Sequence, residues 1–163
     1  MEFSVLGAGL FTVTIGLWIA GMGLAGLADL ETALKIVFLV GIVTGILFTW
    51  TLVLKDYFSA TILGVAGIFN FMQAGISGFY ENYDDKTASQ VLSYIGIFLL
   101  VAGAVAFTEL ALTYVGAWLV LAGIILFLIT SAVYGKAPKA CSYGIIGISI
   151  INTVLSYMIW LGL

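Results

Sequence analysis

Charged residues are scarce in this chain of 163 residues, since Asp, Glu, Lys and Arg together make up only 8% of it. A typical soluble domain carries roughly 25% of these residues. The surface of a soluble domain cannot be built from so few charged residues. The chain also lacks a basic cluster, which excludes nucleic acid as a partner. Hydrophobic residues make up 63% of the chain. The composition therefore indicates an integral membrane protein.

Histidine is absent, and the chain has one cysteine, Cys141, and one proline, Pro138. The usual metal ligand, catalytic base and pH switch are therefore missing together. A single cysteine excludes an intramolecular disulfide and a zinc or iron–sulfur ligand set. We expect no cofactor, and an intramembrane enzyme is the least favoured class because no set of nucleophile, base and metal can be assembled.

Long apolar runs alternate with short charged connections along the whole chain. A bilayer core about 30 Å thick needs about 20 apolar residues per helix. The runs predict spans at 4–27, 34–54, 58–79, 89–108, 112–134 and 140–161. The first run is expected to be a retained span and not a cleaved signal. The sequence predicts an all-α membrane protein in which residues 1–163 form one six-helix domain.

The lysines are distributed unequally between the two ends of the predicted bundle. Connections after the first, third and fifth spans carry Lys35, Lys86, Lys136 and Lys139, and the opposite end carries only Lys55. The positive-inside rule then predicts that the four lysines face the cytoplasm and that both termini lie outside.

Glycine is frequent within the predicted spans, although it weakens helices in water. In lipid, small residues four apart let helix backbones approach closely, and Gly41 and Gly45 have this spacing. The glycines therefore indicate a tightly packed bundle.

The third span contains the most distinctive polar pair. In the segment Phe69-Asn70-Phe71-Met72-Gln73, Asn70 and Gln73 lie three residues apart and share a helix face. Carboxamides donate and accept hydrogen bonds, so the pair could replace part of the hydration shell of urea or a small amide in a narrow pore. An interhelical hydrogen bond is an equally open interpretation.

The last two spans add further candidates. Ser149, Asn152 and Ser156 form a polar stripe in the sixth span, with Asn152 as its strongest member. Trp118 and Leu121 share a face of the fifth span, which could line a hydrophobic constriction or simply pack.

Glu109 is the acidic residue closest to a predicted span. It is either a pH-sensitive buried acid or, in the favoured interpretation, a turn residue at the level of the lipid headgroups. No fixed charge lies at the centre of a span, which favours a small neutral solute over an ion.

These features together resemble the AmiS/UreI family of bacterial urea and short-chain amide channels. The resemblance depends on six short spans, on Gly26-Leu27 followed after a polar break by Ala33 and Gly41, on the segment 69–76, and on a tryptophan-bearing fifth span that leads through Gly135-Lys136 into the last.

The resemblance implies a pore within each protomer, a homohexameric ring and a bacterial inner membrane. It also implies that the path is lined by Phe69, Asn70, Gln73, Trp118 and Leu121. Acid-gated members use loop histidines and a carboxylate in the last span, whereas this chain has no histidine and no acid from Ile145 to Leu163. That form of proton gating is therefore not expected.

The leading functional hypothesis is a passive channel for urea or a simple amide. The alternative is a proton-coupled transporter of a small monocarboxylate such as acetate, although the asparagine–proline signature of the six-span family with that activity is missing. A third possibility is an accessory subunit that transports nothing and has no continuous water-accessible path.

Overall fold

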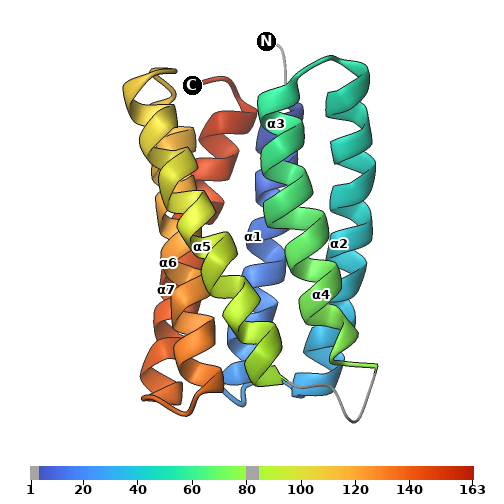
Figure 1. The fold of residues 1–163 in the computed structure, drawn as a ribbon, viewed down its shortest axis with the longest axis vertical. Helices are drawn as coiled ribbons and strands as arrows, with labels where there is room; N and C mark the ends of the chain where they lie inside the picture. Colours follow the sequence, from blue (N-terminus) through green and yellow to red (C-terminus); the bar gives the residue numbers. More distant parts are fainter. Residues whose placement is uncertain (1–3, 80–84) are drawn as a thin grey trace.

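The computed structural model describes residues 4–79 and 85–163 and shows an upright bundle of helices (Figure 1). Its elements are α1 (Val5–Leu24), α2 (Leu30–Val53), α3 (Tyr57–Ile62), η1 (Leu63–Phe69), α4 (Asn70–Ile76), α5 (Asp85–Thr108), α6 (Thr113–Val133) and α7 (Pro138–Trp160). The π-helical segment η1 joins α3 and α4 into one continuous span. Within the described residues, six helices are long and apolar enough to cross a membrane.

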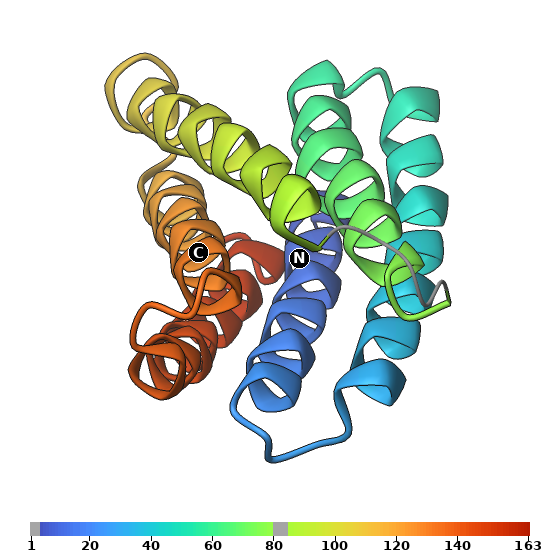
Figure 2. The ribbon, with the colours of Figure 1, turned by 60° about the horizontal axis from the view of Figure 1, so that its bottom comes forward.

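The six spans follow one another around the bundle in chain order, and α7 returns to pack against α1 (Figure 2). The ring is tightly packed except between the third and fourth spans. There the beginning of α5 contacts α4 and η1. Further along, α5 diverges from α3 and packs against α6.

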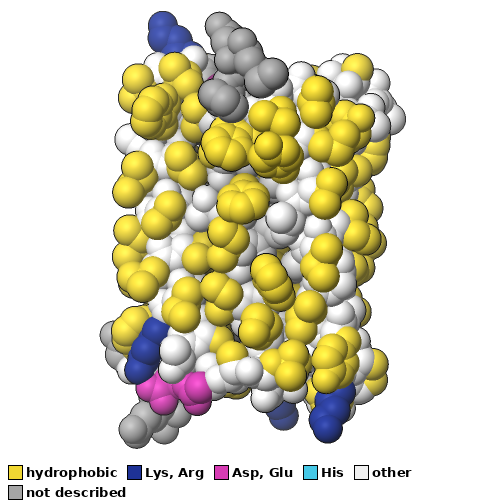
Figure 3. Space-filling view, turned by 180° about the vertical axis from the view of Figure 1, so that it is seen from behind, with side chains coloured by type: hydrophobic (Ala, Val, Ile, Leu, Met, Phe, Trp, Pro, Cys, Tyr) yellow, Lys and Arg dark blue, Asp and Glu magenta, His cyan; other side chains and the backbone are white. Residues whose placement is uncertain are grey.

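The outer surface between the two ends of the bundle is hydrophobic. Large apolar side chains on several helices point outward, including Leu39, Ile46, Val101 and Val154. Charged side chains visible in Figure 3 lie at the two ends, and hydrophobic side chains cover the flank between them. A surface of this kind is stable in lipid and not in water. The fold is that expected of an integral membrane protein.

The two ends of the bundle differ in charge. Lys35, Lys86, Lys136 and Lys139 belong to the end where α1 meets α2 and α6 meets α7, which we call the lysine end. The chain termini and Lys55 belong to the opposite end, which we call the terminal end (Figure 1). Of the charged connection predicted at 81–86, residues 81–84 lie outside the described residues, and Asp85 and Lys86 belong to α5.

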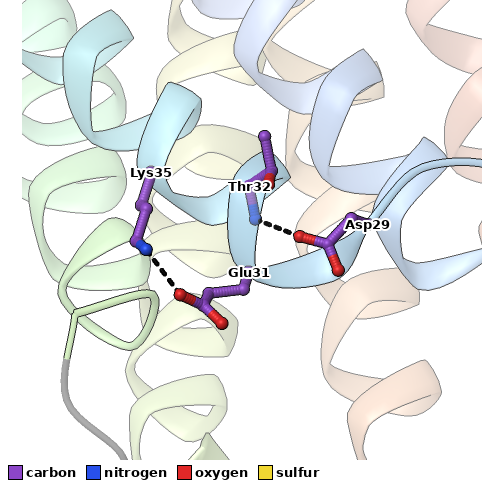
Figure 4. Close-up of polar contacts among 4 residues, drawn as sticks. All are labelled: Asp29, Glu31, Thr32 and Lys35. Atoms are coloured by element: carbon purple, nitrogen blue, oxygen red, sulfur yellow. Dashed lines mark hydrogen bonds and ion pairs between the residues drawn. The ribbon is translucent and has the colours of Figure 1, made fainter.

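A capping residue sets where α2 begins at the lysine end. Asp29 caps α2 by accepting a hydrogen bond from the Thr32 backbone N–H at 2.8 Å, and Lys35 pairs with Glu31 one turn further on (Figure 4). Hydrogen bonds from the Thr32 side chain and backbone N–H hold the pKa of Asp29 below its ordinary value. The acidic first turn also suits the positive end of the helix dipole.

Glycines allow the helix backbones to approach one another, as the sequence predicts. A methyl group added at Gly41 would lie 3.2 Å from the backbone nitrogen of Met72. At Gly45 the nearest atoms would be 3.8 Å away, an ordinary contact, so only the first of this predicted pair lies at a close crossing.

Candidate functional site

A cavity opens near the lysine end, between α1, α2, α4, α5 and α6. Its walls are mostly leucine, isoleucine, valine and alanine side chains, and its polar members are Asn70, Ser77 and Ser89. Its volume is about 90 Å³. A water molecule needs roughly 10–15 Å³ of such space, so the cavity has room for several waters or one small solute.

Asn70 supplies the carboxamide of this cavity and is 3% exposed. It lies at the junction of η1 and α4, immediately after the π-helical segment. Such segments are rare, often mark functional sites, and shift the register of the turns that follow. Gly67 within η1 fits closely against α2, because a methyl group there would lie 2.0 Å from Cγ2 of Thr44. This packing holds η1 on α2 and so positions the Asn70 face of α4.

A second, wider cavity of about 630 Å³ opens at the terminal end. It lies between the beginning of α3, the turn between α5 and α6, and the two ends of the chain. Its polar lining includes Ser4, Asp56, Ser59 and Thr113, and Tyr114 and Val115 of α6 complete one wall. The two cavities thus lie near opposite ends of the bundle.

A buried barrier separates the two cavities. On α1, Leu6 lines the terminal-end cavity and Leu17 lines the lysine-end cavity. These residues are eleven positions apart, which corresponds to about 16 Å along a helix. Leu10, Val13 and Thr14 lie between them and are at most 1% exposed. The cavities are therefore not connected in this conformation.

Trp118 of α6 is the largest side chain in the barrier and is fully buried. Its indole Nε1–H donates a hydrogen bond of 3.1 Å to Oγ1 of Thr14. The Thr14 hydroxyl donates to the carbonyl of Leu10 at 2.8 Å and lies 3.4 Å from Oγ of Ser156. Three helices, α1, α6 and α7, therefore meet at one polar cluster inside an apolar barrier.

Asn152 and Ser149 of α7 lie one and two turns from Ser156 on the same helix and are fully buried. Neither Oδ1 nor Nδ2 of Asn152 has a hydrogen-bond partner, and Oγ of Ser149 has none. Buried polar groups are nearly always paired, so two unpaired side chains side by side are unusual.

Among the described residues, no buried side chain carries a formal charge. The pair formed by Lys35 and Glu31 is exposed at the lysine end. Across the same residues, no group of three or more His, Cys, Asp or Glu side chains is placed to hold a metal ion. The interior is therefore uncharged wherever the structure describes it.

The structure brings together only some of the residues that the sequence singled out. Asn70 lines the lysine-end cavity, and Trp118 and Asn152 lie in the buried interior. Phe69 is 55% exposed on the outer surface and lines neither cavity. Phe69 points outward because the rotation of this span turns Asn70 and Phe71 toward the cavity.

Gln73 and Leu121 are half-buried and line neither cavity, and Glu109 is exposed in the turn between α5 and α6. Gln73 therefore does not share the cavity with Asn70, although the two are three residues apart. Glu109 occupies the turn position that the sequence favours and lies away from Asn70, Trp118 and Asn152.

The sequence carries no functional signal for Thr14, because a threonine in a helix readily bonds to its own backbone. It makes that bond, and it also accepts the Trp118 indole N–H. This second contact depends on how α1 and α6 pack, and no local sequence pattern signals it.

Comparisons with models of protein families, with curated proteins and with solved structures found no match.

Proposed function

We propose that the protein is a passive channel for urea or a small amide. One observation carries the proposal: two cavities near opposite ends of one six-helix bundle are separated by an uncharged barrier, and one of them contains a buried carboxamide. An uncharged interior suits a neutral solute, because an ion that enters it loses hydration without gaining a charged partner.

The Asn70 carboxamide supports an amide or urea as the solute. It can donate and accept hydrogen bonds at once, as these solutes can, and so can replace water that they lose on entering. A monocarboxylate carrier is less well supported, since an acetate anion would find no buried cation among the described residues.

Conduction requires the barrier to open. Trp118 lies one turn from Tyr114 and Val115, which line the terminal-end cavity, while Thr14 lies one turn from Leu17, which lines the other. We propose that the Trp118 indole moves away from Thr14 when the two cavities join.

Replacing Asn70 with leucine should reduce urea and acetamide permeability about ten-fold, because the solute loses a hydrogen-bonding partner that is worth roughly 1–3 kcal/mol in a buried site. Stopped-flow light scattering on proteoliposomes measures the change. Thr61→Ala is the matched control, since Thr61 is an exposed residue of the same span whose hydroxyl bonds to the Tyr57 carbonyl. Equal permeability of Asn70→Leu and Thr61→Ala would contradict a role for Asn70.

The family resemblance and the lysines lead to proposals on location and assembly. We propose a bacterial inner-membrane protein with both termini outside, since the four lysines gather at one end of the bundle. The resemblance alone leads us to propose a homohexamer with one pore per protomer. A mass in native mass spectrometry that differs from six protomers would contradict the hexamer.

The orientation of the bundle in the membrane can be tested with single-cysteine variants in which Cys141 is replaced by serine. Lys55→Cys should react with a membrane-impermeant maleimide on intact cells, because Lys55 is exposed at the terminal end. Lys136→Cys, exposed at the lysine end, should react only after the membrane is permeabilised. The reverse pattern would place the termini in the cytoplasm.

A further inference from the structure

Ser149 and Asn152 stand apart from the other buried polar side chains of the bundle. Several buried hydroxyls donate to the carbonyl four residues earlier in their own helix: those of Thr14, Thr44, Ser142 and Ser156. Ser149 lies on the same helix as two of these residues but makes no such bond. Its hydroxyl is therefore unpaired even though a local partner is the common outcome for this residue type.

The two unpaired side chains adjoin each other. Residues three apart on a helix have Cβ atoms about 5–6 Å from each other and project from one face. That spacing is about the span of two hydrogen bonds in series. Both side chains are fully buried and line neither cavity, so neighbouring side chains must move aside for one small molecule to bond to both. Asn152 offers two N–H donors and a carbonyl acceptor, and Ser149 offers a hydroxyl that can do either.

The position of the pair is deep in the bilayer. Asn152 is eight residues from Trp160 and fourteen from Pro138, or about 12 and 21 Å from the ends of α7. Ser156, one turn away, adjoins Thr14 and through it Trp118. The pair therefore lies beside the barrier between the two cavities, where bulk water does not satisfy polar groups.

We propose that Ser149 and Asn152 form a buried binding site for one small neutral molecule that both donates and accepts hydrogen bonds, namely water or an amide such as urea. The absence of buried charge among the described residues excludes an ionic guest at this position. Binding of an amide depends on the proposed channel function, and the pair would then be a solute-binding site within the barrier. Binding of water does not depend on that function.

Nuclear magnetic resonance can observe this site directly. The chain has three asparagines, Asn70, Asn82 and Asn152. Protein in lipid bilayers with ¹⁵N in its asparagine side chains should therefore give three amide signals. The Asn152 signal is identified by its loss in Asn152→Leu or, if that variant does not assemble, by elimination with Asn70→Leu and Asn82→Ser.

We expect acetamide to move the Asn152 signal in a saturable way if the guest is an amide. A magnetisation-transfer peak to water, without a response to acetamide, would identify the guest as water. Ser149→Ala should weaken the acetamide response about two- to ten-fold or remove the water peak, which reflects the loss of one hydrogen bond. Ser142→Ala is the control, because the Ser142 hydroxyl donates to the Pro138 carbonyl. This variant should change neither the acetamide response nor the water peak of Asn152.

An Asn152 signal that neither responds to acetamide nor exchanges with water would overturn this proposal. The result is separable from that of the channel proposal, which depends on permeability. A responsive Asn152 in a protein that shows no urea or acetamide flux would keep the site and reject the channel. Normal urea or acetamide flux together with an Asn152 signal that shows no response would keep the channel and reject the site.

Discussion

Replacing Gly7 with alanine should strongly destabilise the bundle. The added Cβ would lie 2.4 Å from both the Cα and the backbone nitrogen of Trp160, where α1 crosses α7. A helix backbone cannot move aside as a flexible side chain can, so the two helices must separate. We expect a loss of roughly 3 kcal/mol in unfolding free energy, at the upper end of the usual cost of overpacking.

The unfolding midpoint in mixed detergent micelles with increasing dodecyl sulfate measures this loss. Gly147→Ala provides the matched control, because Gly147 is an exposed residue of α7 and a methyl group there would meet no atom within 4 Å. The control should unfold like the wild type. Similar midpoints for Gly7→Ala and Gly147→Ala would show that α1 and α7 do not cross as described.

Trp118→Ala should have the second large effect, on both stability and permeability. Trp118 is fully buried, and removing its ring leaves a void whose cost is typically about 3–5 kcal/mol. The same void lies in the barrier between the two cavities. We therefore expect higher permeability to urea and acetamide, together with entry of larger amides such as butyramide, in the stopped-flow assay.

Trp118→Phe separates the volume of the ring from its hydrogen bond. Phenylalanine fills much of the space but lacks the N–H that donates to Thr14. Thr14 keeps its own bond to Leu10, so no hydroxyl donor is left unpaired. This variant should lose about 1 kcal/mol and exclude butyramide as the wild type does. If Trp118→Ala is no more permeable to urea and amides than Trp118→Phe, then Trp118 is not part of the barrier.

The sequence predicts the spans well because hydrophobic length is a property of the chain alone. The largest differences, four residues each, lie at the start of the fourth span, predicted at 89 where α5 begins at Asp85, and at the start of the second span, predicted at 34 where α2 begins at Leu30. Charged residues suggested a connection there, but Asp29 caps the helix and Glu31 pairs with Lys35 within its first turns. Local capping therefore extends the helix through a charged stretch.

The candidate site could be predicted only in part. Asn70 and Asn152 were identified because a carboxamide inside an apolar run needs a partner, and Trp118 because it shares a face of its span with Leu121. All three are buried. The contact between Trp118 and Thr14 depends on helix packing, and the π-helical segment before Asn70 leaves no clear periodic signal. The outward position of Phe69 follows from the rotation of this span, which hydrophobic composition does not determine.

Solute entry into proteoliposomes tests the proposed channel most directly. Stopped-flow light scattering would follow purified protein challenged with gradients of urea, acetamide and acetate at neutral and acid pH. A passive channel should give rapid, unsaturated entry of urea or acetamide above the background of empty liposomes. Entry of acetate alone, saturable and dependent on a proton gradient, would contradict the channel and show a coupled carrier.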